Sequence, residues 1–113
     1  MNSKIALQSS HLLLESELVA QVFEGIQYAY AAYEESQNCI LVTPVNSVWF
    51  TKIHKPAQFL LKMRNLKGDR SLAIREILLD NDLDTSDRLL DYELVTKTNL
   101  IKIYADGKAE KTE

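Results

Sequence analysis

The sequence predicts a small α+β domain made of β-hairpins and short helices and organised around a repeated segment. Its 113 residues are enough for one domain, or for two very small ones that share a core. With 46% hydrophobic and 26% charged residues, the composition is that of an ordinary globular protein. We therefore expect one compact domain over residues 1–105, followed by a charged, disordered tail at 106–113.

The repeated segment is Leu7–Val19, which overlays Leu83–Val95 without gaps at an offset of 76 residues. Seven of the 13 overlaid positions are identical. Leucine-rich segments also resemble one another by chance, so the overlay leaves open whether the repeat is structural. If it is, the pseudo-repeats cover about residues 4–45 and 80–105, with a helical connection at 46–79.

Short apolar runs and turn residues alternate at the start of the chain. Lys4–Leu7 predicts a short strand and Ser9-Ser10 a turn, and His11–Leu14 is a second apolar run. Ser16 is a suitable N-cap for a helix that runs to about Phe23, because its hydroxyl can accept an unpaired backbone N–H.

Residues 26–36 are compatible with two structures. Apolar residues at helical spacing would allow one helix from Ser16 to about Glu35. Alternation of tyrosine with alanine instead predicts a β-hairpin, with Tyr28–Tyr33 paired to Cys39–Thr43. We favour the hairpin, because Gly25 interrupts the helical pattern.

The middle of the chain has helical patterns. A short helical turn is expected from Asn46-Ser47 through Phe50, and Pro56 is well placed in the first turn of a second helix that ends at Gly68. A third helix would begin at Asp69 or Ser71. The second helix is expected to carry an apolar stripe of Phe59, Leu60, Met63 and Leu66. The third is expected to bury Leu72, Ile74, Ile77 and Leu78, with Leu79 as a further candidate.

The C-terminal part predicts an acidic loop followed by a hairpin. The loop is Asp80–Asp87, and the strands are Leu89–Val95 and Leu100–Tyr104. The loop's alternate carboxylates resemble a calcium-binding loop, but Thr85 stands where such a loop needs glycine for its sharp turn. We therefore prefer a solvated acidic turn without a metal.

Catalytic and cofactor-binding signatures are weak in this sequence. His11 and His54 are the only histidines, and neither has a cysteine or second histidine at metal-ligand spacing. With three glycines in the chain, there is no glycine-rich phosphate-binding motif. We expect a non-catalytic protein without cofactors.

Cysteine usage and hydropathy suggest the compartment. Cys39 is the only cysteine, so it cannot form an internal disulfide, and its apolar neighbours predict a buried, inert thiol. No apolar run approaches the roughly 18 to 20 residues of a membrane-spanning helix, and the first residues do not resemble a signal peptide. We expect a cytoplasmic protein that does not associate with a membrane.

The net charge of −3 conceals a segregation of charge along the chain. Residues 1–51 carry −4, residues 52–75 carry +6 and residues 76–113 carry −5. The basic centre could contact a polyanion, or the acidic parts of its own chain or of a partner subunit. The alternative is that these cations are only the solvated face of a helix. The candidate phosphate-binding residues of this centre are Lys52, Lys55, Lys62, Arg64, Lys67 and Arg70.

Three passages give the chain a resemblance to the MraZ branch of the AbrB-type swapped-hairpin (SpoVT-AbrB-like) family. Asp84–Leu90, DTSDRLL, resembles the family's Asp-x-x-Gly-Arg-like signature and the aliphatic residues that follow it. Gln8–Leu14, QSSHLLL, is similar to the same signature. Cys39–Val45, with Trp49 four residues later, is similar to the strand and the Pro-x-x-x-Trp-like passage that close the first MraZ unit.

The resemblance implies two tandem AbrB-like units, each with a strand, a turn, an aliphatic triplet, a short helix and a β-hairpin. It also implies a transcriptional regulator that binds double-stranded DNA as a homo-oligomer, a dimer or a larger ring. Arg88 is the cation that remains at a signature position, whereas Asp87 and His11 replace the signature glycine. The implied site joins Arg88 to the basic centre. In the alternative hypothesis the scaffold serves protein–protein interaction, with the basic centre of one chain on the acidic ends of another.

Overall fold

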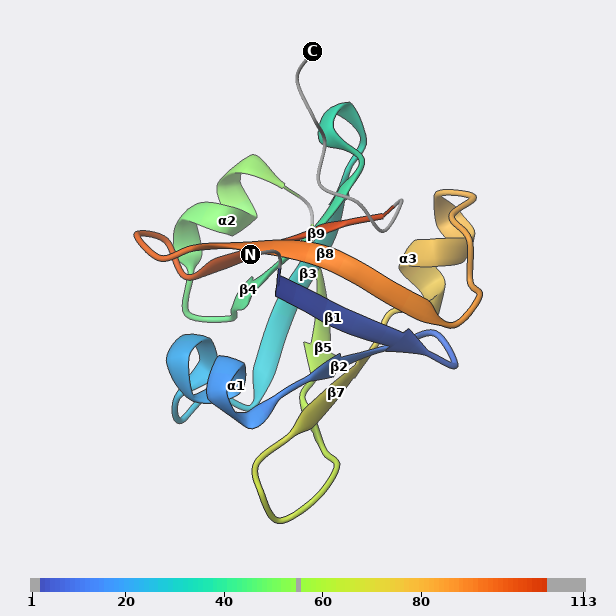
Figure 1. Ribbon diagram of the computed structural model, residues 1–113. Coiled ribbons are helices and arrows are strands. Elements are labelled where there is room, and N and C mark those ends of the chain that lie inside the picture. Colours follow the sequence, from blue (N-terminus) through green and yellow to red (C-terminus); the bar gives the residue numbers. More distant parts are fainter. Residues whose placement is uncertain (1–2, 55, 106–113) are drawn as a thin grey trace.

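Antiparallel strands form one nine-stranded sheet that curls into a nearly closed barrel, accompanied by short helices (Figure 1). This computed structural model describes residues 3–54 and 56–105, so the predicted tail at 106–113 lies outside the described residues. The elements are β1 Ser3–Gln8, β2 His11–Leu14, α1 Ser16–Phe23, β3 Tyr28–Glu34, the 3-10 helix η1 Glu35–Gln37, β4 Cys39–Pro44, α2 Val48–Ile53, β5 Ala57–Leu60, β6 Lys62–Met63, β7 Arg70–Ala73, α3 Arg75–Asp80, β8 Arg88–Val95 and β9 Leu100–Tyr104. The strand order is β5-β3-β4-β9-β8-β1-β2-β7-β6.

The predicted α+β class is confirmed, as are the elements of the N-terminal part. β1, the turn at Ser9-Ser10 and the hairpin of β3 with β4 lie where the sequence placed them. The single long helix is excluded, since α1 ends at Phe23 and Gly25 has a φ of +72°. The N-cap role of Ser16 is wrong: α1 begins with Ser16, and the preceding residue Glu15 makes no side-chain capping hydrogen bond.

The prediction of a helix after Pro56 is wrong. Residues 57–60 form β5, which pairs with β3, and residues 62–63 form β6, which pairs with β7. The third helix is shorter than predicted, because Arg70–Ala73 is β7 and α3 begins at Arg75. Long-range strand pairing overrides the helical spacing of the apolar residues. The predicted α2, β8 and β9 are confirmed, and so is the burial of Leu72, Ile74, Ile77 and Leu78. Leu79, the further candidate for burial, is exposed at the end of α3.

The barrel consists of two units with the same order of elements. The first unit, residues 3–44, contains β1, β2, α1, β3 and β4, and the second unit, residues 57–104, contains β5 with β6, β7, α3, β8 and β9. The register repeats as well. In the β3–β4 hairpin the facing pairs run from Ala31–Val42 to Glu34–Cys39. Adding 61 to these residue numbers gives the facing pairs of the β8–β9 hairpin, from Tyr92–Ile103 to Val95–Leu100. The two C-terminal hairpins are therefore pseudo-equivalent.

The two units exchange their first strands. Strand β1 of the first unit pairs with β8 of the second, with Ile5 facing Leu90, and β5 of the second pairs with β3 of the first, with Phe59 facing Ala29. The pseudo-twofold axis runs between β4 and β9 and between β2 and β7, where Leu12 faces Leu72. Each unit therefore completes the sheet of the other.

This structural repeat differs from the repeat seen in the sequence. The offset of 76 overlays Ser16–Val19, which is helical, on Tyr92–Val95, which is a strand. The second unit begins at residue 57, within the segment 46–79 that was predicted to be a helical connection. That prediction is therefore wrong for β5, β6 and β7.

Two apolar clusters stabilise the fold. The larger fills the barrel with side chains from both units, among them Leu7, Leu14, Phe23, Ile40, Leu90 and Ile103. The smaller lies between β4 and α2, where Phe50 packs with Leu41 and the buried thiol of Cys39. Within the described ranges, no helix is long and apolar enough to cross a membrane.

Candidate nucleic-acid interface

The first hairpins of the two units differ in their turns. In the first unit Gln8 faces His11 across the two-residue turn Ser9-Ser10. In the second unit Lys62 faces Ser71 and Met63 faces Arg70, and six further residues, 64–69, form the turn. We call residues 62–70 the basic arm. Figure 1 shows its loop projecting beyond the end of the barrel, at the bottom of the view.

Four of the predicted phosphate-binding residues lie on the basic arm. Lys62, Arg64 and Lys67 are exposed, and Arg70 is partly buried. With Asp69 as the only carboxylate, the arm carries a net charge of +3. Strand pairing thus gathers on one projecting hairpin cations that were predicted to be spread along two helices.

Apolar side chains accompany the cations on the arm. Leu66 has a relative exposure of 101% and Met63 of 65%. Both were predicted to lie on the apolar stripe of a helix. The sequence does contain a signal for the arm, since Asn65, Gly68 and Asp69 are typical turn residues. Exposed leucine at the end of a hairpin is a feature that sequence reasoning missed.

Hydrogen bonds within the loop hold the arm in one shape. The Arg64 backbone N–H donates to the Asp69 carbonyl oxygen at 3.0 Å. The Asn65 Oδ1 accepts from the backbone N–H groups of Lys67 at 3.0 Å and Asp69 at 3.3 Å, and Asn65 Nδ2 donates to Asp69 Oδ2 at 2.9 Å. Gly68 has a φ of +103°, which side-chain-bearing residues rarely adopt. The loop is therefore preorganised.

Asp69 also attaches the arm to the first unit. The Ser16 backbone N–H donates to Asp69 Oδ1 at 2.8 Å, so a carboxylate from the arm caps the start of α1. Hydrogen bonds from Asn65 and Ser16, and the charges of Lys67 and Arg64, lower the pKa of Asp69. An open cleft of about 380 Å³ lies between α1 and the arm.

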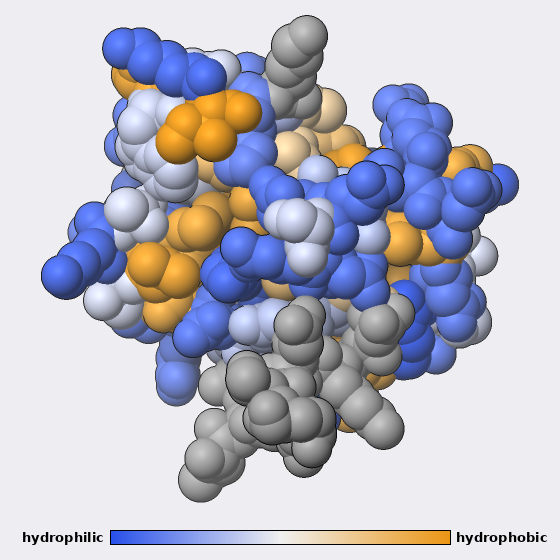
Figure 2. All heavy atoms as spheres, turned by 90° about the horizontal axis from the view of Figure 1, so that it is seen from above, coloured by the Kyte–Doolittle hydropathy of each residue, from blue (hydrophilic) through white to orange (hydrophobic). Residues whose placement is uncertain are grey.

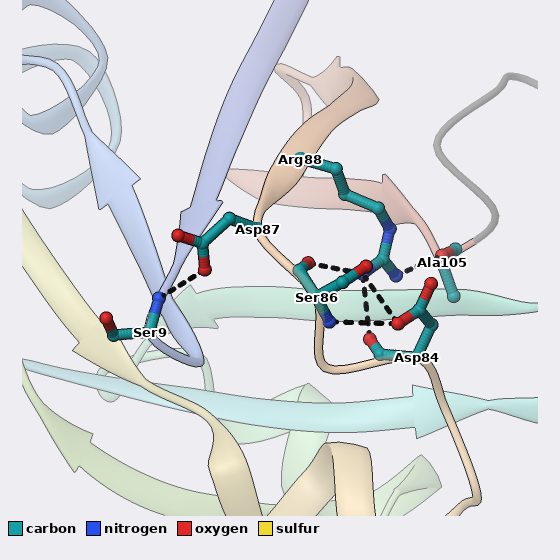
Figure 3. Close-up of polar contacts among 6 residues, drawn as sticks. All are labelled: Ser9, Asp84, Ser86, Asp87, Arg88 and Ala105. Atoms are coloured by element: carbon teal, nitrogen blue, oxygen red, sulfur yellow. Dashed lines mark hydrogen bonds and ion pairs between the residues drawn. The ribbon is translucent and has the colours of Figure 1, made fainter.

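Arg88 lies in a different part of the molecule, where it binds backbone carbonyls (Figure 3). Its Nη1 donates to the carbonyl oxygens of Asp84 and Ser86, both at 2.8 Å, and its Nη2 donates to that of Ala105 at 2.9 Å. The side chain is 20% exposed. Arg88 therefore fixes the loop before β8 to the end of β9.

The loop that Arg88 fixes supports the turn of the first hairpin. Asp87 Oδ1 accepts a hydrogen bond from the Ser9 backbone N–H at 2.8 Å (Figure 3). In the same loop, hydrogen bonds from Ser86 lower the pKa of Asp84. We call residues 84–88 the brace. The signature-like motif of the sequence thus positions the hairpin β1–β2.

The remaining candidates lie apart from the arm. Lys52 is exposed on α2, and Lys55 lies outside the described residues. In the acidic region, Asp91 is buried and its Oδ1 lies 2.6 Å from Lys4 Nζ, so its carboxylate is used in an ion pair. Among the residues that the structure describes, no three His, Cys, Asp or Glu side chains are grouped to hold a metal ion.

Where its residues are described, the face opposite the arm is a mixture of charged and apolar side chains (Figure 2). Figure 2 shows this face with several separate apolar patches among charged side chains. The exposed large apolar residues outside the arm are Tyr28 and Leu60, which face each other across β3 and β5, Val48 and Ile53 on α2, Leu79 on α3 and Leu89 on β8. The basic arm is therefore the feature with the clearest charge and shape for a partner.

Comparison of the chain with protein-family models, curated proteins and solved structures finds no match.

Proposed function

We propose that this protein is a small non-catalytic regulator of the AbrB/MraZ type that binds double-stranded DNA through its basic arm. The observation that carries the proposal is the projecting, preorganised hairpin, which has four cations and a single carboxylate (Figure 1). That carboxylate, Asp69, already accepts a hydrogen bond from the Ser16 backbone N–H. Lysine and arginine neutralise backbone phosphates, and such contacts position a protein on a DNA duplex. Cytoplasmic location and assembly into a homo-oligomer belong to the same proposal.

The arrangement of the first unit supports the AbrB-like part of this proposal. Strand β1, the turn, the leucines of β2, α1 and the hairpin β3–β4 follow one another in the order that the resemblance implies. The exchange of first strands between the units also fits a swapped-hairpin scaffold. In this proposal the phosphate contacts are made by Lys62, Arg64, Lys67 and Arg70. Arg88 acts through the brace, since its guanidinium is occupied by backbone carbonyls.

The salt dependence of DNA binding tests the proposal. We expect the wild-type chain to bind random-sequence duplex DNA at low salt and to lose affinity steeply as salt rises. Replacing Arg64 and Lys67 together by alanine should weaken binding and reduce the slope of log K against log salt by about 1.8, at about 0.9 per lost phosphate contact. The measurement is fluorescence anisotropy of a labelled duplex over a series of salt concentrations.

A matched variant distinguishes an effect of the arm on DNA binding from an effect of the protein's net charge. Lys52 on α2 and Lys97 in the β8–β9 turn are both exposed, and neither belongs to the arm. Replacing these two by alanine removes the same net charge and should leave the slope nearly unchanged. Equal effects of the two double variants would contradict a specific role for the arm. Absence of wild-type binding at low salt would contradict DNA binding itself.

The second candidate function is protein–protein interaction, with the arm of one chain docked on the acidic part of another copy. The exposure of Leu66 and Met63 favours this candidate, because apolar side chains at a protruding tip suit a protein surface. The Arg64 and Lys67 double variant would then shift the oligomer toward monomer at low salt. Measurement of mass in solution without DNA distinguishes this outcome from loss of DNA binding.

A further inference from the structure

We infer that Leu66, at the tip of the basic arm, is a wedge that enters the minor groove of DNA and partly unstacks a base step, so that binding bends the duplex. This inference rests on the proposed DNA binding and adds how the arm engages the duplex. Leucine is one of the side chains that minor-groove proteins insert between base steps.

The exposure of Leu66 is unusual within this molecule. The other exposed large hydrophobic residues have relative exposures between 41% and 68%, whereas that of Leu66 is 101%. A fully exposed leucine contributes no burial of apolar surface in the free protein. The side chain is therefore available in full to a partner.

The loop network presents Leu66 in a defined position. Asn65 Oδ1 accepts the N–H groups of Lys67 and Asp69, the two hydrogen bonds that close the loop beyond Leu66. Asp69 in turn accepts from the Ser16 N–H at the start of α1. A wedge must resist displacement when it separates stacked bases, and here the loop is tied to the barrel through α1.

The charges beside Leu66 suit a groove bounded by phosphates. Arg64 and Lys67 are exposed on either side of it in sequence. The two cations can contact the phosphates of the two strands while the leucine between them contacts a base step. The minor groove is only about 6 Å wide, which suits a loop tip better than a complete ribbon. The pseudo-equivalent turn Ser9-Ser10 has neither cations nor an apolar side chain, so the wedge belongs to the six-residue turn alone.

The experiment compares bending with affinity in the full chain. A short duplex of random sequence carries a fluorescence donor and acceptor at its two ends, and energy transfer is measured at saturating protein and low salt. Wild-type protein should raise the transfer efficiency, corresponding to a bend of about 20–90°. Leu66→Ser should abolish most of this change while affinity falls only a few-fold, because no phosphate contact is lost. The Arg64 and Lys67 double variant should show the converse, with weaker binding but a bend at saturation.

Leu79→Ser is the matched control, since Leu79 is an exposed leucine on α3, outside the arm. It should bend DNA as the wild type does, and unchanged thermal midpoints would show that both variants fold. If Leu66→Ser binds and bends like the wild type, the wedge is overturned and DNA binding stands. If the wild type binds no DNA, the proposed function and the wedge both fall. If Leu66→Ser instead changes the mass of the free protein, Leu66 is a contact between copies and the wedge is overturned.

Discussion

The two first hairpins occupy equivalent places in the barrel and differ mainly in their turns. Both begin with a strand that crosses into the sheet of the other unit, and their second strands, β2 and β7, pair with each other. The first turn has two residues, whereas the second has six, 64–69, which include two cations and Leu66. A two-residue turn is sufficient to connect the strands at this place in the barrel. The longer turn can therefore contact a partner without disturbing the core.

The two turns are also held by different means. The Ser9-Ser10 turn depends on the brace, through Asp87, and both serines have positive φ angles, 51° and 63°. The turn of the arm is held by Asn65 and Asp69, which belong to it. The first hairpin thus relies on the opposite unit for its shape, whereas the arm carries most of its own support.

The largest effect on stability is expected from Arg88→Ala, which removes the support of the first turn. Three carbonyl oxygens lose a charged donor, and we expect the free energy of unfolding to fall by about 2–4 kcal/mol. Arg88→Lys should recover only part of this loss, because one ammonium cannot reproduce the planar set of donors. Urea unfolding measures both variants. Wild-type stability of Arg88→Ala would show that the brace is held by other contacts.

A smaller effect of opposite sign is expected from relieving the backbone of the first turn. Asn-Gly is the preferred pair for a two-residue hairpin turn in which both residues have positive φ. Replacing Ser9 by Asn and Ser10 by Gly should raise the free energy of unfolding by about 1 kcal/mol, because left-handed backbone is unfavourable for ordinary residues. The same denaturant titration measures the gain. Lower stability would indicate that the Ser10 side chain, which is buried, matters more than the backbone.

The smallest effect is expected from Asp69→Ala, which detaches the arm from α1. The carboxyl pKa is lowered in the folded protein, so the carboxylate stabilises the fold above its ordinary pKa of about 3.9, and this contribution is lost as the pH falls through the folded pKa. The variant should melt slightly below the wild type at neutral pH, and the difference should vanish in acid. Melting curves from neutral pH to about pH 2 test this. A difference that persists at the lowest pH would indicate lost packing instead.

The contrast between the turns shows which parts of the candidate site the sequence could predict. The basic residues were identified from charge alone, and four of them do lie together. That these cations lie on one hairpin could not be predicted, because β7 pairs with β2, which is far away in the sequence, as well as with β6. Leu66 was expected on the apolar stripe of a helix and is instead the most exposed of the large hydrophobic residues described.

The elements that could be predicted from the amino-acid sequence are those whose partners are close along the chain. The hairpins β3–β4 and β8–β9 join neighbouring runs of alternating residues, and Gly25 ends α1, so local backbone preference was sufficient there. Tertiary structure decided residues 57–73, whose strands pair with β3 and β2, far away in the sequence. It also decided the role of Arg88. The family resemblance predicted that this cation contacts DNA, but its N–H groups donate to three backbone carbonyl oxygens. The reason in both cases is that a backbone hydrogen-bonding group is satisfied by whichever partner the whole fold brings to it.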